Sequence, residues 1–330
     1  MKVINARNVH EALPLAMKLL HSEGSEQNSR NGKVLSMGPV ATVYHVPEER
    51  VILHPWRDAN PFFHFYESLW MLAGRNDVRP LTRYVKRMAS FSDDGETFSA
   101  AYGWRWGNQL PIIIETLKAN HNDRRCVLQM WDRRYDLGSA SKDVACNVAA
   151  TFQISGGRLE MVVFCRSNDI IWGCYGANAV HFSMLMEYVA RNVGVPMGTY
   201  TQVSVNWHAY RETFDPIVDD ALDKVSPNPY YLRANRPFPL MSVSRELWDA
   251  DVRRFVTADG RATVESFNDP FFNDVALPIV HAHDIYKDAI GEDRYLGALE
   301  MLDDCKALDW RRACMDWIER RRASWIHAQG

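Results

Sequence analysis

The sequence predicts an α+β fold, in which a mixed sheet packs against helices. Two observations support this class. Alternating strand patterns in the middle of the chain are joined by a tight glycine turn, which is typical of a hairpin. Amphipathic helix patterns flank these strands, but no glycine-rich phosphate loop or dinucleotide fingerprint follows any of them. This order of elements disfavours a doubly wound parallel sheet.

Apolar residues recur at helical spacing in five parts of the chain. The strongest pattern covers residues 60–74, where nearly the whole face is apolar and Gly74 is suited to end the helix. The same periodicity predicts helices over residues 8–22, 110–120 and 178–193, and a helical tail over 293–322.

Strand patterns lie between these helices. A hairpin is expected from 151–154 to 159–164, with Gly156 and Gly157 at its turn. This hairpin would place Cys146 and the polar residues 166–169 at one end of a sheet. Further strands are expected over 34–46, 126–131 and 199–205, whereas residues 22–32 contain so many turn formers that they predict an irregular loop.

Length and composition limit the class of protein. The chain has 330 residues, 47% hydrophobic and 24% charged, with a net charge of -3. We expect a single domain over residues 1–330, with a divergent helical C-terminal region from about residue 215. A slightly acidic chain is not suited to duplex nucleic acid. Without a signal peptide, a membrane-spanning run or a disulfide-type cysteine pattern, we expect a cytoplasmic protein with no membrane partner.

Cys146 is the first candidate for chemistry. A single cysteine near a strand is more often an inert, buried side chain than a nucleophile. Cations that are close in sequence or across the hairpin favour the functional interpretation, because positive charge stabilises the thiolate.

Arginines are the second signal. Arg30 lies in the polar loop, Arg124 and Arg125 precede a strand, and Arg166 follows one beside Ser167. Guanidinium groups with a hydroxyl form a multidentate receptor for a phosphate monoester. Ordinary surface ion pairs would explain any one of these arginines equally well.

The remaining candidates are a carboxylate, an amide and an aromatic pair. Glu67 lies within the apolar helix at 60–74, either at its edge or lining a cavity as a general acid or base. Asp169 and Asn178 could bind the polar edge of a pyrimidine, or serve as a cap or turn residue. His208 and Tyr210 are spaced to share one face at a strand end, which suits a sugar hydroxyl.

In this order, the motifs resemble those of thymidylate synthase and the related pyrimidine-nucleotide hydroxymethylases. The resemblance runs over residues 30–210 and rests on seven segments. They are Asn28-Ser-Arg30-Asn-Gly32, Glu67-Ser-Leu-Trp70, Tyr102-Gly-Trp-Arg-Trp106, Arg124-Arg125, Cys146, Arg166-Ser167-Asn168-Asp169…Gly173…Asn178, and His208-Ala-Tyr210.

The resemblance implies a thymidylate-synthase-like sheet, a homodimer and a role for each segment. Cys146 would be the nucleophile, with Glu67, Asp169, Asn178 and Tyr102 as further catalytic residues. The other roles would be phosphate binding by Arg30, Arg124, Arg125, Arg166 and Ser167, base binding by Asn178, Asp169 and Asn147, and sugar binding by His208 and Tyr210. Arg124 and Arg125 would serve the neighbouring subunit. No resident metal is implied.

The family chemistry implies a covalent bond from Cys146 to C6 of a pyrimidine nucleoside monophosphate. The activated C5 would then take a one-carbon unit from 5,10-methylenetetrahydrofolate. Hydride from the folate would end the reaction at a methyl group, and water would end it at a hydroxymethyl group.

The chain departs from thymidylate synthase at four points, and three of them favour water: the altered Cys-Asn pair, the missing tryptophan and the missing apolar tail. The nucleophile stands in Ala145-Cys146-Asn147 instead of Pro-Cys-His, and one extra residue precedes Asn178. The segment between Gly74 and Tyr102 lacks the tryptophan-rich run near the folate, and the apolar C-terminal tail is replaced by Ser-Trp-Ile-His-Ala-Gln-Gly. Because hydride transfer needs a closed, dry site, we expect a hydroxymethylase, of phage DNA modification or of a nucleoside pathway.

Three questions stay open at this point. Asn178 favours uracil, hence dUMP, but dCMP and CMP remain possible substrates. Thymidylate synthase is the second hypothesis. Outside this chemistry, the alternatives are an inactive nucleotide- or RNA-binding regulator, and a metal protein that uses Cys165, Cys174 and His181, whose spacing matches no strong zinc pattern.

Overall fold

The computed structural model describes residues 1–224, 227–232, 235–262 and 266–329. The chain groups into two compact units, each built from separate segments. Unit 1 contains residues 1–57 and 99–228, and unit 2 contains residues 58–98 and 229–330. The expectation of one domain over the whole chain stays a prediction.

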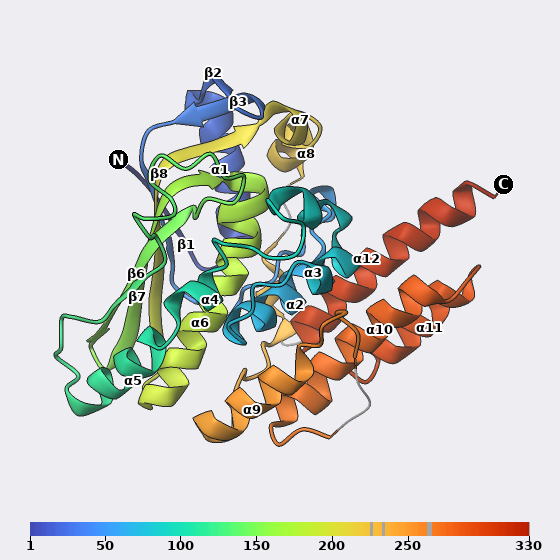
Figure 1. Cartoon of the computed structure of the whole chain (residues 1–330). Helices are drawn as coiled ribbons and strands as arrows, with labels where there is room; N and C mark the ends of the chain where they lie inside the picture. The colour runs from blue at the N-terminus through green and yellow to red at the C-terminus, as the bar shows by residue number, and fades with distance from the viewer. Residues whose placement is uncertain (225–226, 233–234, 263–265, 330) are drawn as a thin grey trace. The chain divides into compact units, whose positions relative to one another are not determined.

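Unit 1 is built on an eight-stranded mixed sheet (Figure 1). Its main path runs in the order β1-β4-β8-β7-β6-β5, and the β2–β3 hairpin joins through β3 and β8. The pairs β1/β4 and β7/β8 are parallel, and the other pairs are antiparallel. The strands are β1 (Lys2–Ala6), β2 (Ser25–Ser29), β3 (Gly32–Met37), β4 (Val40–Tyr44), β5 (Val127–Gln129), β6 (Asn147–Ser155), β7 (Arg158–Asp169) and β8 (Met197–Tyr210).

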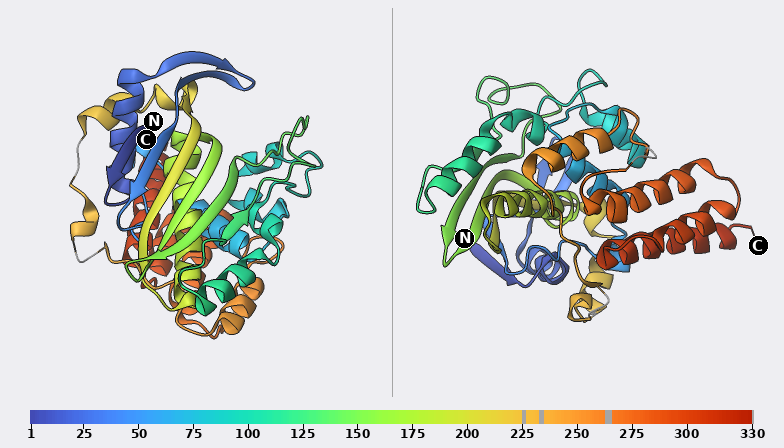
Figure 2. Two further views of the ribbon diagram at one scale, coloured as in Figure 1. Left: turned by 90° about the vertical axis from the view of Figure 1, so that its left-hand side faces the viewer. Right: turned by 90° about the horizontal axis from the view of Figure 1, so that it is seen from below.

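Helices of unit 1 pack on one face of this sheet. The longest is α6 (Asn178–Val193), which is buried on every side from Asn178 to Ala190. The helix α1 (Val9–Glu23) begins at Asn8, whose side chain accepts from the Glu11 backbone N–H, and packs beside β1 and β3. The opposite sheet face carries no helix among the described residues of this unit (Figure 2, left). The other helices of unit 1 are α4 (Tyr102–Trp106), α5 (Gln109–Ala119), α7 (Arg211–Phe214), α8 (Val218–Asp223) and the turns Pro55–Arg57 and Ile170–Ala177.

Unit 2 is helical and aromatic at its centre. The helix α2 (Pro61–Leu72) contacts α9, α10 and α12, and its Phe62 and Phe65 pack against Trp317 and Trp310. Burial of such aromatic side chains supplies most of the stabilisation that a helical unit needs. The further helices are α3 (Arg79–Tyr84), α9 (Arg245–Phe255), α10 (Leu277–Asp288), α11 (Asp293–Leu302) and α12 (Leu308–His327), with turns at Lys86–Phe91, Pro229–Tyr231 and Phe272–Ala276.

The α+β class and the mixed sheet are confirmed. The central hairpin is formed by β6 and β7, with Gly156 and Gly157 at its turn and both at positive φ. Gly74, at φ 70°, follows α2 as expected of a residue that ends a helix. No helix in the described ranges is long and apolar enough to cross a membrane.

Three element predictions were wrong. Residues 22–32 are not an irregular loop, because Ser25–Ser29 form β2 and pair with β3. This strand is exposed along its whole length, so no apolar alternation marks it. The strand expected over 34–46 is divided at Gly38 and Pro39 into β3 and β4, and the helical tail over 293–322 is two helices separated at residues 303–307.

Candidate active site

Cys146 immediately precedes β6, at the end of the central hairpin. Opposite it, the backbone N–H of Arg166 on β7 donates to the Cys146 carbonyl at 2.9 Å. The Arg166 guanidinium donates to the carbonyl oxygens of Ala145 (2.7 Å) and Val144 (3.0 Å), and one of its nitrogens lies 3.9 Å from the Cys146 Sγ. The hairpin therefore holds a cation beside a half-buried thiol.

The environment of Cys146 affects its ionisation in both directions. Burial raises the pKa of the thiol, and the Arg166 charge lowers it, while Asp143 and Asp136 add to the rise. The net pKa lies above the ordinary value of a cysteine. The sequence expectation that nearby cations would favour the thiolate is therefore correct for Arg166 alone, and burial outweighs it in the free protein.

Replacing Arg166 with methionine is expected to shift the pH–rate profile of kcat to higher pH by about one unit or more. The reactive form is the thiolate, so activity rises with pH as Cys146 loses its proton. Removing the neighbouring cation raises the pKa of the thiol and moves this rise upward. Arg158→Met, at the other end of β7, is the control and should leave the inflection in place. An unchanged inflection in Arg166→Met would show that the guanidinium does not act on the thiol.

The loop before Cys146 is held by Arg105 on α4. Its guanidinium pairs with the buried Asp136 and donates to the carbonyl oxygens of Ser99 (2.6 Å) and Met130 (3.0 Å). Tyr102, one turn earlier on α4, accepts from the backbone N–H of Asn147 at 3.3 Å. Burial raises the pKa of Tyr102, so its phenol stays protonated. Tyr102 thus contacts the residue that follows Cys146.

Asn147 and Asn178 meet directly. The Asn147 Nδ2 donates to the Asn178 Oδ1 at 3.1 Å, and the Asn178 Nδ2 donates to the Oδ1 of Asn168 at 3.0 Å. Both partners of Asn178 are almost fully buried, and Asn178 itself is 8% exposed. Since Asn147 adjoins Cys146, this contact brings the predicted base-binding amide into the neighbourhood of the thiol.

A widened helical turn precedes Asn178. Residues Ile170–Ala177 form a π-helix, and Tyr175 and Gly176 leave helical geometry there (φ -105° and -120°). A π-helical turn is the usual way for a helix to absorb an inserted residue. Such a turn suits the extra residue expected before Asn178, which is the first residue of α6.

Asp169 caps this turn. Its Oδ1 accepts from the backbone N–H groups of Ile171 (2.8 Å) and Trp172 (2.7 Å), and its Oδ2 accepts from that of Tyr210 (3.4 Å). Burial raises the pKa of Asp169, opposed by these N–H groups and by His208. The structure thus gives Asp169 the capping role that was its alternative interpretation, next to the ends of β7 and β8.

His208 and Tyr210 stand beside Asp169. The parallel register of β7 and β8 pairs Asp169 with His208, and the rings of His208 and Tyr210 meet edge to face at 5.6 Å. One site thus contains Cys146, Asn147, Arg166, Ser167, Asp169, Asn178, His208 and Tyr210, with Tyr102 behind Asn147.

The other predicted phosphate-binding arginines are not gathered at this site. Arg30 is exposed in the turn between β2 and β3, and Arg124 and Arg125 are exposed just before β5. Arg125 forms an ion pair with Asp123 at 2.5 Å and lowers the pKa of that carboxyl to about 2. Within the described part of one chain, only Arg166 of these four contacts the thiol.

Glu67 lies on α2 in unit 2, where its side chain is half-buried among the aromatic residues of that helix. Its assignment as a general acid or base stays a prediction. The described residues contain no group of three His, Cys, Asp or Glu side chains arranged to bind a metal.

Sequence reasoning assigned no role to Asn168, although it stands in the motif at 166–169, and did not single out Gln202. Both are buried amides on β7 and β8, and they hydrogen-bond at 3.2 Å. The available signal was Gln202, because it stands at an inward position of the alternating strand over 199–205, where an apolar residue is normal.

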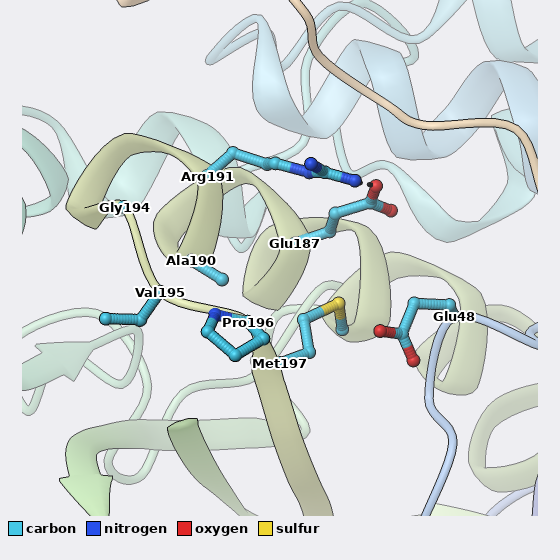
Figure 3. Close-up of a pocket in the computed structure, with 8 residues that line it drawn as sticks. All are labelled: Glu48, Glu187, Ala190, Arg191, Gly194, Val195, Pro196 and Met197. Carbon is cyan, nitrogen blue, oxygen red and sulfur yellow. Dashed lines mark ion pairs between the residues drawn. The ribbon is translucent and has the colours of Figure 1, made fainter. Parts of the chain in front are cut away.

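A separate pocket of about 430 Å³ lies at the far end of α6 from Asn178 (Figure 3). Glu187 lines it, and this buried carboxylate pairs with Arg50 at 2.6 Å and with Arg191 at 3.8 Å. The remaining lining includes Glu48, Pro196 and Met197.

Comparison with known proteins identifies the family of this chain. A thymidylate synthase family model matches residues 15–255, beyond both ends of the 30–210 stretch that carries the motifs. A deoxyuridylate hydroxymethyltransferase of Pseudomonas phage M6 is 51% identical, over 98% of this chain and 95% of its own. One of Bacillus phage SP01 is 34% identical over 62% of this chain and 57% of its own. A putative thymidylate synthase of Methanosarcina barkeri is 26% identical over 66% of this chain and 93% of its own. The chain therefore belongs to the thymidylate synthase family.

Proposed function

We propose that this protein is a deoxyuridylate hydroxymethyltransferase, which adds a hydroxymethyl group to C5 of dUMP. The observation that carries the proposal is the site formed by Cys146, Arg166 and the Asn147–Asn178 pair. A thiol beside a cation can add to an electron-poor ring carbon, and an amide can hold the polar edge of that ring. The relatives named as deoxyuridylate hydroxymethyltransferases support the choice of dUMP and of this product.

Each residue has a task in this reaction. Cys146 forms the bond to C6 of the uracil, which makes C5 nucleophilic. Asn178 hydrogen-bonds the ring and stabilises the charge that develops on it. Arg166 stabilises the thiolate and, with Ser167, binds the 5′-phosphate. His208 and Tyr210 hold the sugar, and Glu67 moves protons.

The one-carbon donor is 5,10-methylenetetrahydrofolate, which supplies a methylene unit at the oxidation level of formaldehyde. The structure contains a surface suited to its flat ring. Trp172 is 53% exposed three residues after Asp169, and the Arg57 guanidinium lies 5.2 Å from its ring on one side. A fixed, exposed indole is a stacking surface for a pterin.

Mass spectrometry of the nucleotide products tests this function. The protein is incubated with methylenetetrahydrofolate and, separately, dUMP, dCMP and CMP. The expected result is hydroxymethyl transfer to dUMP. Transfer to dCMP or CMP instead would overturn the base assignment, a methyl product would make the protein a thymidylate synthase, and no product with any nucleotide would favour a binding regulator. Because the relatives named as deoxyuridylate hydroxymethyltransferases are phage proteins, we place this activity in the cytoplasm of a bacterial host.

The active form is proposed to be a homodimer in which Arg124 and Arg125 bind the phosphate of the neighbouring site. Both arginines are exposed, and two large apolar side chains of β7 and β8, Phe164 (42%) and Val205 (58%), are exposed as well. One face of the sheet carries no helix among the described residues of its own unit (Figure 2). Exposed apolar side chains on an uncovered sheet are suited to a symmetric interface.

Mixing two inactive variants is expected to restore activity. In a heterodimer of Cys146→Ala and Arg124→Ala/Arg125→Ala subunits, one site contains both an intact thiol and the intact arginines of its neighbour. Activity above the sum of the two separate variants would support the assignment. The control sample contains only Cys146→Ala subunits. A fully active protein that sedimentation equilibrium shows to be a monomer would contradict the assignment.

A further inference from the structure

A chain of buried amides extends from the nucleophile into the sheet. The Cys165 thiol donates to the Asn147 Oδ1 (2.7 Å), and the Asn147 Nδ2 donates to Asn178. Asn178 donates to Asn168, and the Asn168 Nδ2 donates to the Oε1 of Gln202 (3.2 Å). Every amide in this series donates in the same direction, from Asn147 towards Gln202.

The far end of the chain fixes this direction. The Gln202 Nε2 donates to the backbone carbonyl of Cys174 at 3.0 Å. A carbonyl oxygen can only accept, so Gln202 must turn its nitrogen towards Cys174 and its oxygen towards Asn168. Asn168 must then turn its nitrogen towards Gln202 and its oxygen towards Asn178. The same rule orients Asn178, because its nitrogen must face Asn168.

The near end cannot impose the opposite direction. A thiol can donate or accept, so Cys165 accommodates either orientation of Asn147. Burial raises the pKa of Cys165 far above its ordinary value, so it remains a donor here. Ser204, which accepts from the Asn168 Nδ2 at 3.0 Å, is likewise able to donate or accept. Among the contacts of the described residues, only the Cys174 carbonyl supplies a fixed direction.

Gly173 leaves room for the amide chain at the contact between Asn168 and Asn178. A Cβ on Gly173 would lie 2.8 Å from the Asn168 Oδ1 and 3.3 Å from the Asn178 Nδ2. A side chain at position 173 would therefore press on the contact that links these two residues. Asn147 and Gln202 have no exposed surface, and Asn168 is 2% exposed, so water has little access to replace the hydrogen bonds.

Within these described contacts, Asn178 keeps one N–H and one oxygen lone pair for a ligand. Uracil presents a carbonyl at C4 and an N–H at N3, whereas cytosine presents an amino group and a bare nitrogen at the same two positions. The bond to Cys146 and the phosphate contacts fix where these positions lie. One orientation of the Asn178 amide therefore matches uracil, and the opposite orientation matches cytosine.

We infer that Gln202 and Asn168 are positioning residues that set the base specificity, because they transmit the direction of the Cys174 carbonyl to Asn178 and lock it in the orientation that selects uracil. This inference rests on the proposed function. Neither residue touches the nucleotide. If the Asn178 amide flipped, its buried hydrogen bond with Asn168 would become a mismatched contact. The free-energy cost of that mismatch holds the amide in the orientation that binds uracil.

Binding of dUMP and dCMP without folate, measured by isothermal titration calorimetry, tests the inference. Gln202→Met removes the acceptor that faces Asn168. It leaves Ser204, whose hydroxyl can hydrogen-bond Asn168 in either orientation of the amide. The ratio of the dCMP Kd to the dUMP Kd is expected to fall by about tenfold or more, equivalent to about 1.4 kcal/mol. Asn168→Ala interrupts the chain one residue nearer to Asn178 and should give the same fall, which keeps the test valid if one variant does not fold.

Two control variants separate direction from simple loss of packing. Gln202→Glu, protonated in this buried position, donates its O–H to the Cys174 carbonyl and keeps an oxygen acceptor facing Asn168, so it should retain the wild-type ratio. Ser204→Ala removes a hydrogen bond from the same cluster without changing its direction, and should also retain it. Circular dichroism confirms that each variant is folded.

The outcomes distinguish this inference from the proposed function. A wild-type protein that binds no dUMP would refute the proposed function. Selective binding of dUMP by wild type, with an unchanged ratio in folded Gln202→Met or Asn168→Ala, would refute the role of the amide chain alone. An equal fall in Ser204→Ala would show that packing, and not direction, controls the ratio.

Discussion

Cys146→Ala is expected to lower kcat by a factor on the order of 10⁴ or more, while dUMP binding is retained. The thiol forms the bond that activates C5, and no other group can replace a covalent nucleophile. The phosphate, sugar and base contacts are made by other side chains, so the affinity for dUMP changes little. Product formation is measured by mass spectrometry, and binding by calorimetry on the same preparation.

Cys126→Ala provides the matched control. Cys126 is a buried cysteine that lies just before β5 and away from the Cys146–Arg166 pair. This variant should keep nearly full activity. Turnover that persists in Cys146→Ala would refute covalent catalysis by this residue, and loss of dUMP binding would show that the thiol has a structural role instead.

Arg50→Met is expected to lower the free energy of unfolding by about 3–5 kcal/mol. Arg50 and Glu187 are each 5% exposed and pair at 2.6 Å. Glu187 also lines the pocket at the end of α6 (Figure 3). Removing the guanidinium leaves the Glu187 carboxylate buried without its close partner, which costs much more than the pair contributes. Urea denaturation followed by circular dichroism measures the change.

Arg191→Met is the comparison for this variant. Arg191 is half-exposed and lies 3.8 Å from the same carboxylate, so its loss should cost at most about 1 kcal/mol. Equal losses of unfolding free energy in the two variants would contradict this prediction, since it rests on the burial of the Arg50–Glu187 pair.

Local sequence patterns were sufficient to predict most of the fold. The apolar periodicity that marks α2 and α6, and the glycine turn of the β6–β7 hairpin, are short-range signals that packing reinforces. The strand β2 could not be predicted because all its side chains face solvent, so only its pairing with β3 defines it. The break between β3 and β4 depends on which neighbours each segment finds, and β4 alone pairs with β1.

The candidate site was predicted in part. Motif order placed Cys146, Arg166, Asn178 and His208 together, because the hairpin and the parallel β7–β8 pair align the ends of their strands. The balance of burial and charge at the thiol could not be predicted, because it depends on three-dimensional solvent exclusion. The amide chain through Asn168 and Gln202 joins residues 34 positions apart in sequence, and no local pattern reveals such a contact.

The source of the hydroxyl oxygen in the product tests the central claim most directly. The reaction of dUMP and methylenetetrahydrofolate is run in water enriched in ¹⁸O, and the nucleotide is analysed by mass spectrometry. The account predicts 5-hydroxymethyl-dUMP that carries one ¹⁸O atom, with release of tetrahydrofolate. A methyl product without ¹⁸O, with release of dihydrofolate, would contradict it and show that hydride rather than water ends the reaction.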